Sequence, residues 1–165
     1  MESSSLLAML YFGRSRLLGS LEAIEKSGKP AAEVLLWRPA PTRAHIAWQA
    51  LHCAATHDRY YHVFIKGEAK PSDAMLVENF GGGSTPSDDM VPNLAHIRSM
   101  LLGHFTTLRD YVSTLTPSDL QTVVGPPDRQ RKLGDAIILL AWHEAHHQGQ
   151  LHLTWNLYNQ AYRPA

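Results

Sequence analysis

Histidines crowd the segment "AWHEAHHQGQLH" at residues 141–152, together with one glutamate and two glutamines. Residues 143–147, H-E-A-H-H, match H-E-x-x-H, in which two histidines one helical turn apart bind zinc and the glutamate is a general base. Two histidines are an incomplete set, because a catalytic zinc site usually takes three protein ligands and leaves one position open for water. The segment therefore predicts a metal site whose kind depends on the third ligand.

The protease interpretation of this motif fails at the third ligand. Only 18 residues follow His147, and none of them is Asp or Glu. The extended protease motif needs glycine at 150 and histidine at 153, where the chain has Gln150 and Leu153. Glu144 lies about 100° from His143 around a helix, so we expect it at the surface or in support of a neighbouring group. The third ligand should come from another segment.

One histidine of an upstream helical segment is placed to complete the set. His143 and His147 lie about 40° apart on one helix face and can hold one ion together. Upstream, His52 lies in the middle of a helical segment, where the protein interior is expected. His45 lies two turns away, and His57 faces away from the His52 stripe. His52 is therefore the candidate third ligand.

The elements that must position these side chains are four long segments with helical periodicity. They cover residues 4–26, 42–66, 93–115 and 133–158. A long, turn-rich link at residues 67–91, containing "GGGSTPSDD", separates the second from the third. This pattern predicts an all-α fold, a four-helix bundle with a long crossover link between helices 2 and 3. One domain is expected to cover residues 1–165.

Composition narrows the classes of partner. Lys plus Arg and Asp plus Glu balance at 15 each, which favours neither nucleic acid nor an anionic membrane. No apolar run approaches the roughly 20 residues that a membrane span needs. The start lacks the basic region of a signal peptide, and Cys53 is the only cysteine, expected to be small and buried. We therefore expect a cytoplasmic protein.

The last helical segment resembles that of a known family. The stretch "LGDAIILLAWHEAHHQGQLHL" is similar to the final bundle helix of the DinB superfamily, whose motif is H-x3-H-x-G-Q. His143, His147, Gly149 and Gln150 match that motif. The family's upstream motif is matched by "WRPAPTRAHIAWQALHCAATHDRYY", which leads to His52. The two motifs fall in the expected helices, so the resemblance covers most of the chain in layout.

This resemblance implies a metal site and a range of activities. It implies a divalent metal, zinc or nickel, held by His52, His143 and His147, with water in the remaining positions. Some branches of the family are thiol-dependent S-transferases or isomerases that use a low-molecular-weight thiol. Members are commonly homodimers. No DNA binding follows from the family name.

The site should open into a cavity for a small-molecule substrate. Arg59 is expected to hold a carboxylate of a substrate or thiol cofactor, or else to pair with Asp58 or Glu144. Gln150 is expected to bind or orient groups at the site, and Gly149 to allow close helix packing. The expected walls of the cavity are Trp48, Thr56, Arg59, Tyr60 and Gln150.

Two classes of function remain open at this point. The first is a metal-dependent enzyme, a thiol-dependent S-transferase or alternatively a hydrolase. The second is a non-catalytic, metal-binding stress-response bundle. An enzyme predicts an open cleft with polar walls beside the ion, whereas a binding protein predicts a closed site or an apolar pocket.

Overall fold

The structure, a computed structural model, describes residues 2–162 and is mostly helical. Its helical elements are α1 (Ser3–Lys26), α2 (Ala31–Leu36), α3 (Ile46–Arg59), the π-helical turn η1 (Tyr60–Ile65), α4 (Ala74–Phe80), α5 (Leu94–Ser113), the 3-10 turn η2 (Asp119–Gln121) and α6 (Leu133–Ala161). Two short strands, β1 (Val123–Val124) and β2 (Arg131–Lys132), pair antiparallel. The predicted all-α class is confirmed. None of the described helices is apolar over enough of its length to cross a bilayer.

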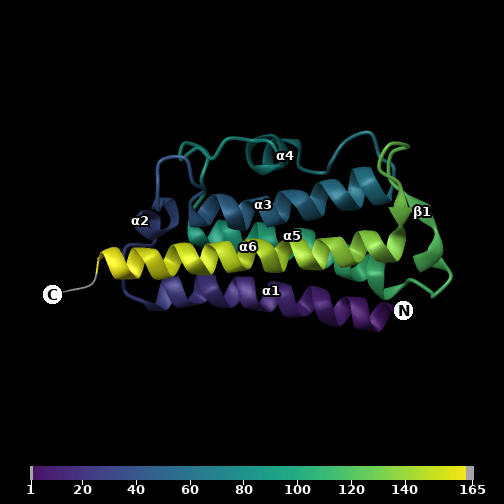
Figure 1. The fold of residues 1–165 in the computed structure, drawn as a ribbon, viewed down its shortest axis with the longest axis horizontal. Coiled ribbons are helices and arrows are strands. Elements are labelled where there is room, and N and C mark those ends of the chain that lie inside the picture. Colours follow the sequence, from purple (N-terminus) through teal and green to yellow (C-terminus); the bar gives the residue numbers. More distant parts are fainter. Residues whose placement is uncertain (1, 163–165) are drawn as a thin grey trace.

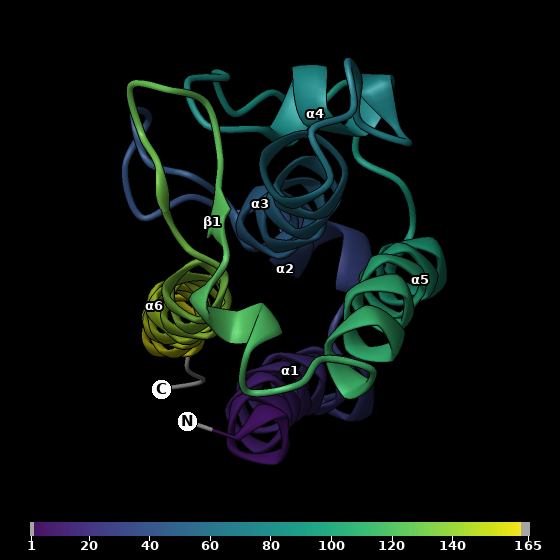
Figure 2. The ribbon, with the colours of Figure 1, turned by 90° about the vertical axis from the view of Figure 1, so that its right-hand side faces the viewer.

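The four long helices α1, α3, α5 and α6 lie side by side along the molecule (Figure 1). Viewed end on, they occupy four corners, and α4 lies outside α3 (Figure 2). Helix α1 packs on α5 and α6, and α3 packs on the same two helices. Helices α3 and α5 run in the same direction (Figure 1), so the chain between them must return along the length of the molecule. The link at residues 66–93 makes this return and contains α4.

The helices differ from the sequence predictions at the start of α3 and in two short helices. Helix α3 begins at Ile46 rather than near residue 42, because the His45 ring accepts a hydrogen bond from the Trp48 backbone N–H at 3.0 Å and caps the helix there. Helices α2 and α4 were not predicted. They have six and seven residues, too few to display a helical period. The end of α1 is as expected, with Gly28 at a φ of 72°.

A buried polar layer divides the apolar interior into two clusters. On α1, Leu10 belongs to one cluster and Leu17 to the other, and Arg14 lies between them. His57 on α3 and Glu144 on α6 are also buried between members of the two clusters. We call Arg14, His57 and Glu144 the central polar layer. It places charged groups in the middle of the helix assembly, where burial is costly unless each group is paired.

Asp58, a buried aspartate near the end of α3, binds the link at residues 66–93. The Asp58 carboxylate accepts hydrogen bonds from the Ser72 hydroxyl and N–H and from the Asp73 N–H. His62 and His104 lie 3.6 and 3.4 Å from its Oδ1. Burial alone would raise the pKa of Asp58, but the bonds from His104, Ser72 and Asp73 outweigh it and lower the pKa to about 2.

Asp58 should therefore contribute a pH-dependent share of stability. Its pKa in the folded protein lies below the value of about 3.9 for an unperturbed aspartate, so its contribution is complete above about pH 4 and is lost as the pH falls towards 2. We expect Asp58→Asn to lower the free energy of unfolding at pH 7 by about 1 to 2 kcal/mol and to flatten its decline below pH 4. Urea unfolding across pH 2.5–7 measures both. An equal loss in the exposed control Asp110→Asn would contradict the assignment.

Candidate metal centre

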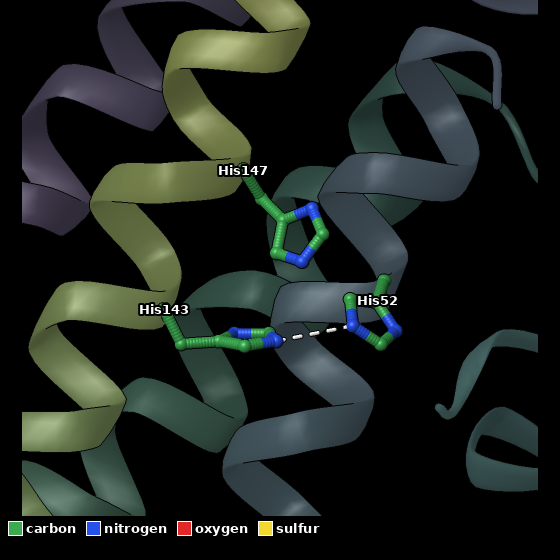
Figure 3. A group of neighbouring side chains, drawn as sticks. All are labelled: His52, His143 and His147. Carbon is green, nitrogen blue, oxygen red and sulfur yellow. Dashed lines mark hydrogen bonds between the residues drawn. The ribbon is translucent and has the colours of Figure 1, made fainter. Parts of the chain in front are cut away.

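Three histidines from two distant segments meet between α3 and α6. His52 projects from α3, and His143 and His147 project from successive turns of α6 (Figure 3). One ring nitrogen from each lies within 4.8 Å of the others, and the Nε2 atoms of His52 and His143 are 3.1 Å apart. The prediction that these three side chains come together is confirmed.

The His52 ring is held in one orientation by a backbone carbonyl. Its Nδ1 lies 2.6 Å from the carbonyl oxygen of Phe80, at the end of α4. Because a carbonyl can only accept, Nδ1 carries the proton and donates it, which leaves Nε2 free to face the other histidines. Trp48 stacks on the same ring, with centroids 4.6 Å apart and planes 9° apart. The unpredicted helix α4 thus determines which nitrogen of His52 is available.

The three rings are neutral at physiological pH. Burial is the main cause of the lowered pKa in each, and neighbouring histidines add to it for two of them. The pKa falls to about 3 for His143 and about 4 for His147, where the nearby Gln150 side chain opposes the shift. A metal ion binds only the unprotonated imidazole. These rings therefore release no protons on binding a metal at neutral pH.

The nitrogen atoms fit a borderline divalent ion. The Nδ1 atoms of His143 and His147 are buried and have no hydrogen-bond partner among residues 2–162. Two nitrogens on one tetrahedral ion lie about 3 to 4 Å apart, because each bond is about 2.0 to 2.1 Å. The described separations need only small ring movements to reach this geometry. Three neutral imidazoles suit zinc or nickel better than magnesium or calcium.

Glu144 lies in the interior, so the expectation of a surface position is wrong. It is 1% exposed, and Arg14 lies against it with Nε 2.6 Å from Oε1 and Nη2 3.2 Å from Oε2. Arg14 Nη1 also donates to the Leu101 carbonyl at 2.6 Å, and Nη2 lies 3.3 Å from His57 Nδ1. Through Arg14, the central polar layer joins all four long helices beside the histidines.

The neutral state of His57 completes the central polar layer. Burial first, and then Arg14, His143 and His104, hold the pKa of His57 well below its usual value. A neutral ring accepts from Arg14 at Nδ1 and turns its remaining proton, on Nε2, towards Glu144 Oε2 at 3.2 Å. Sequence reasoning missed this layer. The available signal was an arginine on the apolar stripe of α1.

A cavity of about 660 Å³ opens beside His52 and His143. Thr56, Arg59 and Tyr60 line it, as expected from the sequence, whereas Trp48 and Gln150 do not. No described carboxylate lies within ion-pair distance of the Arg59 guanidinium, so the expected alternative pairing with Asp58 or Glu144 does not form. Arg59 therefore offers a free cation to the cavity.

The remaining motif residues lie on the outer face of α6. The Gln150 side chain is exposed, and its Nε2 is 2.7 Å from Nε2 of the exposed His146. The His146 ring in turn packs edge-on against His147, with centroids 5.1 Å apart. A Cβ added at Gly149 would meet no described atom within 4 Å, so the expected close helix packing at this glycine is wrong.

The fold and site together define a mostly helical protein with a three-histidine cluster suited to a divalent metal. A family model described as the DinB superfamily matches residues 9–151. The chain belongs to that family. Comparison with curated proteins gives no match.

Proposed function

We propose that this chain is a four-helix-bundle metalloenzyme that binds a divalent ion through His52, His143 and His147 and transfers a low-molecular-weight thiol to an electrophilic substrate. The observation that carries the proposal is the cavity of about 660 Å³ beside His52 and His143. A non-catalytic metal-binding protein has no need of a cavity of this size against two of its ligands. The cavity volume falls within the range of small-molecule sites.

The ion would supply Lewis acidity that favours a thiolate over a thiol at neutral pH. The thiol loses its proton to water, its sulfur forms a bond to an electrophilic carbon, and the leaving group departs with its bonding electron pair. His52 is held for ligation by the Phe80 carbonyl, and Arg59 binds a carboxylate of the thiol. Gln150 orients His146 and His147 from the outer face.

Thiol transfer is favoured over hydrolysis by the side chains around the cavity. Hydrolysis commonly uses a carboxylate or free histidine to move the proton of an attacking water. None of the described residues that line the cavity is Asp or Glu. The sequence neighbour of the site, Glu144, is bound to Arg14. A thiol ionises far more readily than water, so its transfer needs no such base.

A screen of thiols and electrophiles tests this function. Cysteine, glutathione and coenzyme A would be incubated with a chlorobimane electrophile and the zinc- or nickel-loaded protein. Parallel samples would receive nitrophenyl esters and anilides without thiol. We expect thiol conjugation that EDTA abolishes, with no metal-dependent ester or anilide cleavage. Metal-dependent cleavage without thiol would establish a hydrolase, and inactivity in both arms would favour the binding protein.

Arg59→Gln should weaken thiol binding more than it slows the reaction. Loss of one charged hydrogen-bond donor to a carboxylate should raise KM for the thiol about tenfold. The value of kcat should change little, because the guanidinium holds a part of the thiol remote from sulfur. Steady-state kinetics with varied thiol separate the two constants. The exposed α1 variant Arg16→Gln is the matched control, and a fall in kcat at constant KM would contradict this role.

The family resemblance also leads us to propose a homodimer in the cytoplasm. Phe12 and Trp142 are 69% and 57% exposed and offer large apolar side chains for a subunit contact. Light scattering of the purified protein at micromolar concentration gives its molar mass and tests the proposed dimer directly. A monomer mass would rule out the dimer without affecting the metal site.

A further inference from the structure

The wall of the cavity away from the histidines is built by two irregular elements. One is the π-helical turn η1, which contributes Val63 and Phe64. The other is the β1–β2 hairpin at residues 123–132, which contributes Val124, Gly125 and Arg129. π-Helical turns are rare and are often found at functional sites. This wall is therefore a strong candidate for selecting the molecule that enters.

A tight contact holds the hairpin against η1. Gly125 has a φ of 96°, which favours glycine, and a Cβ at this position would overlap the Phe64 ring. The same ring stacks on Tyr60, with centroids 4.8 Å apart, and lies 5.4 Å from the Arg131 guanidinium. Phe64 is thus packed against its own turn and both arms of the hairpin. The wall is a built surface rather than a loose loop.

Cations from three separate segments border the same cavity. Arg59 comes from α3, Lys66 follows η1, and Arg129 comes from the hairpin. Arg129 lies 3.3 Å from Asp128, and Lys66 lies over the Tyr111 ring at 5.1 Å. The described lining itself includes no Asp or Glu, and among the described residues Asp128, outside the lining, is the one carboxylate within ion-pair distance of any of the three cations. The potential in the cavity should therefore be positive.

The geometry points to an organic carboxylate with an apolar body as the molecule that this cavity selects. Lys66 and Arg129 bind this carboxylate, while Arg59 holds the carboxylate of the thiol beside it. Val63, Phe64 and Val124 pack on the apolar body. The role of this carboxylate as the electrophilic substrate rests on the proposed thiol-transferase function. Binding itself requires neither a metal nor a thiol, which allows a separate test.

The test compares two probes of the same shape. Binding of 2-naphthoate and of neutral 2-naphthamide to the metal-free full chain would be measured by calorimetry at 50 mM and 500 mM salt. We expect naphthoate to bind at least fivefold more tightly than the amide at low salt, and to lose this advantage at high salt. Equal affinities of the two probes at low salt would overturn the proposal.

Variants locate the binding to this wall. Arg129→Gln and Lys66→Gln should each weaken naphthoate binding about two- to fivefold, as expected for exposed charge pairs, and should leave the amide unaffected. Gly125→Ala should weaken both probes, because it displaces the hairpin without changing any charge. Arg16→Gln is the charge-matched control. Naphthoate affinity that is unchanged in all three cavity variants would also overturn the proposal.

The outcome is separable from that of the thiol-transfer assay. If no thiol is transferred but naphthoate binds with the expected charge and variant dependence, the cavity assignment stands and the transferase proposal fails. If thiol is transferred but the two probes bind equally, the transferase stands and the carboxylate preference fails. Thermal unfolding of each variant confirms that the compared proteins are folded.

Discussion

Replacement of His143 by alanine is expected to lower the affinity for zinc or nickel by more than about 100-fold. Loss of a hydrogen-bond partner that merely orients a metal ligand typically costs about 10- to 100-fold in affinity, so loss of a ligand should cost more. His52→Ala and His147→Ala should have effects of the same size, because each removes one of three neutral nitrogens that lie within 4.8 Å of one another.

Elemental analysis and chelator competition measure this effect. Each protein would be purified without added metal, analysed for bound ions, and then titrated against a competing chelator. His152→Ala is the matched control, because His152 is an exposed histidine of the same helix and should leave the metal bound. Circular dichroism verifies the helical content of every variant. Full metal stoichiometry in all three site variants would exclude this site.

The second large effect is expected on stability, from Arg14→Met. This substitution leaves the buried Glu144 carboxylate without the cation that lies 2.6 Å from it. Removal of one partner from a buried ion pair typically costs about 3 to 5 kcal/mol. At a urea dependence of about 2 kcal/mol per molar, the unfolding midpoint should fall by about 2 M. Arg14→Lys keeps the positive charge but loses the paired Nε and Nη2 contacts of the guanidinium with Glu144, so we expect a smaller loss of stability.

A double-mutant cycle distinguishes pairing from simple packing. Arg14→Met combined with Glu144→Leu removes both charges from the central polar layer, and such replacements are often neutral or stabilising. We expect the double variant to recover most of the stability that Arg14→Met loses. Strictly additive losses would mean that the two side chains act independently. Bound metal should be measured in the same variants, because Glu144 directly follows His143.

The helical segments and the shared face of two histidines could be predicted from the sequence. Apolar residues recur every three to four positions in all four long helices, and His143 and His147 are four residues apart. Each of these patterns lies within a single helix and can be found without knowledge of the tertiary structure. The choice of His52 over His45 and His57 followed from its place on the helix wheel and from the family resemblance. The structure brings His52 to the other two histidines.

The supporting contacts could not be predicted in this way. Glu144 was expected at the surface or in support of a neighbouring group, because its helix position differs from that of His143. The neighbouring α1 covers that second face and supplies Arg14, so the surface alternative is wrong. Helix α4 is too short to show a period, although its last residue, Phe80, fixes the His52 ring. Asp58 and Glu144 were both possible partners of Arg59. In the structure Asp58 binds Ser72 and Asp73, and Glu144 binds Arg14.

The sequence by itself therefore determined the four long helical segments, which face each histidine occupies and which three could meet. Those properties follow from a rotation of about 100° per residue, which is local to each segment. Only the tertiary structure decided what surrounds each face, because burial, ion pairs and cavities arise between segments far apart in the chain. In the tertiary structure Glu144 is buried against Arg14, and the His52 ring is bound to the Phe80 carbonyl of α4. The turn η1 and the hairpin form the wall of the cavity.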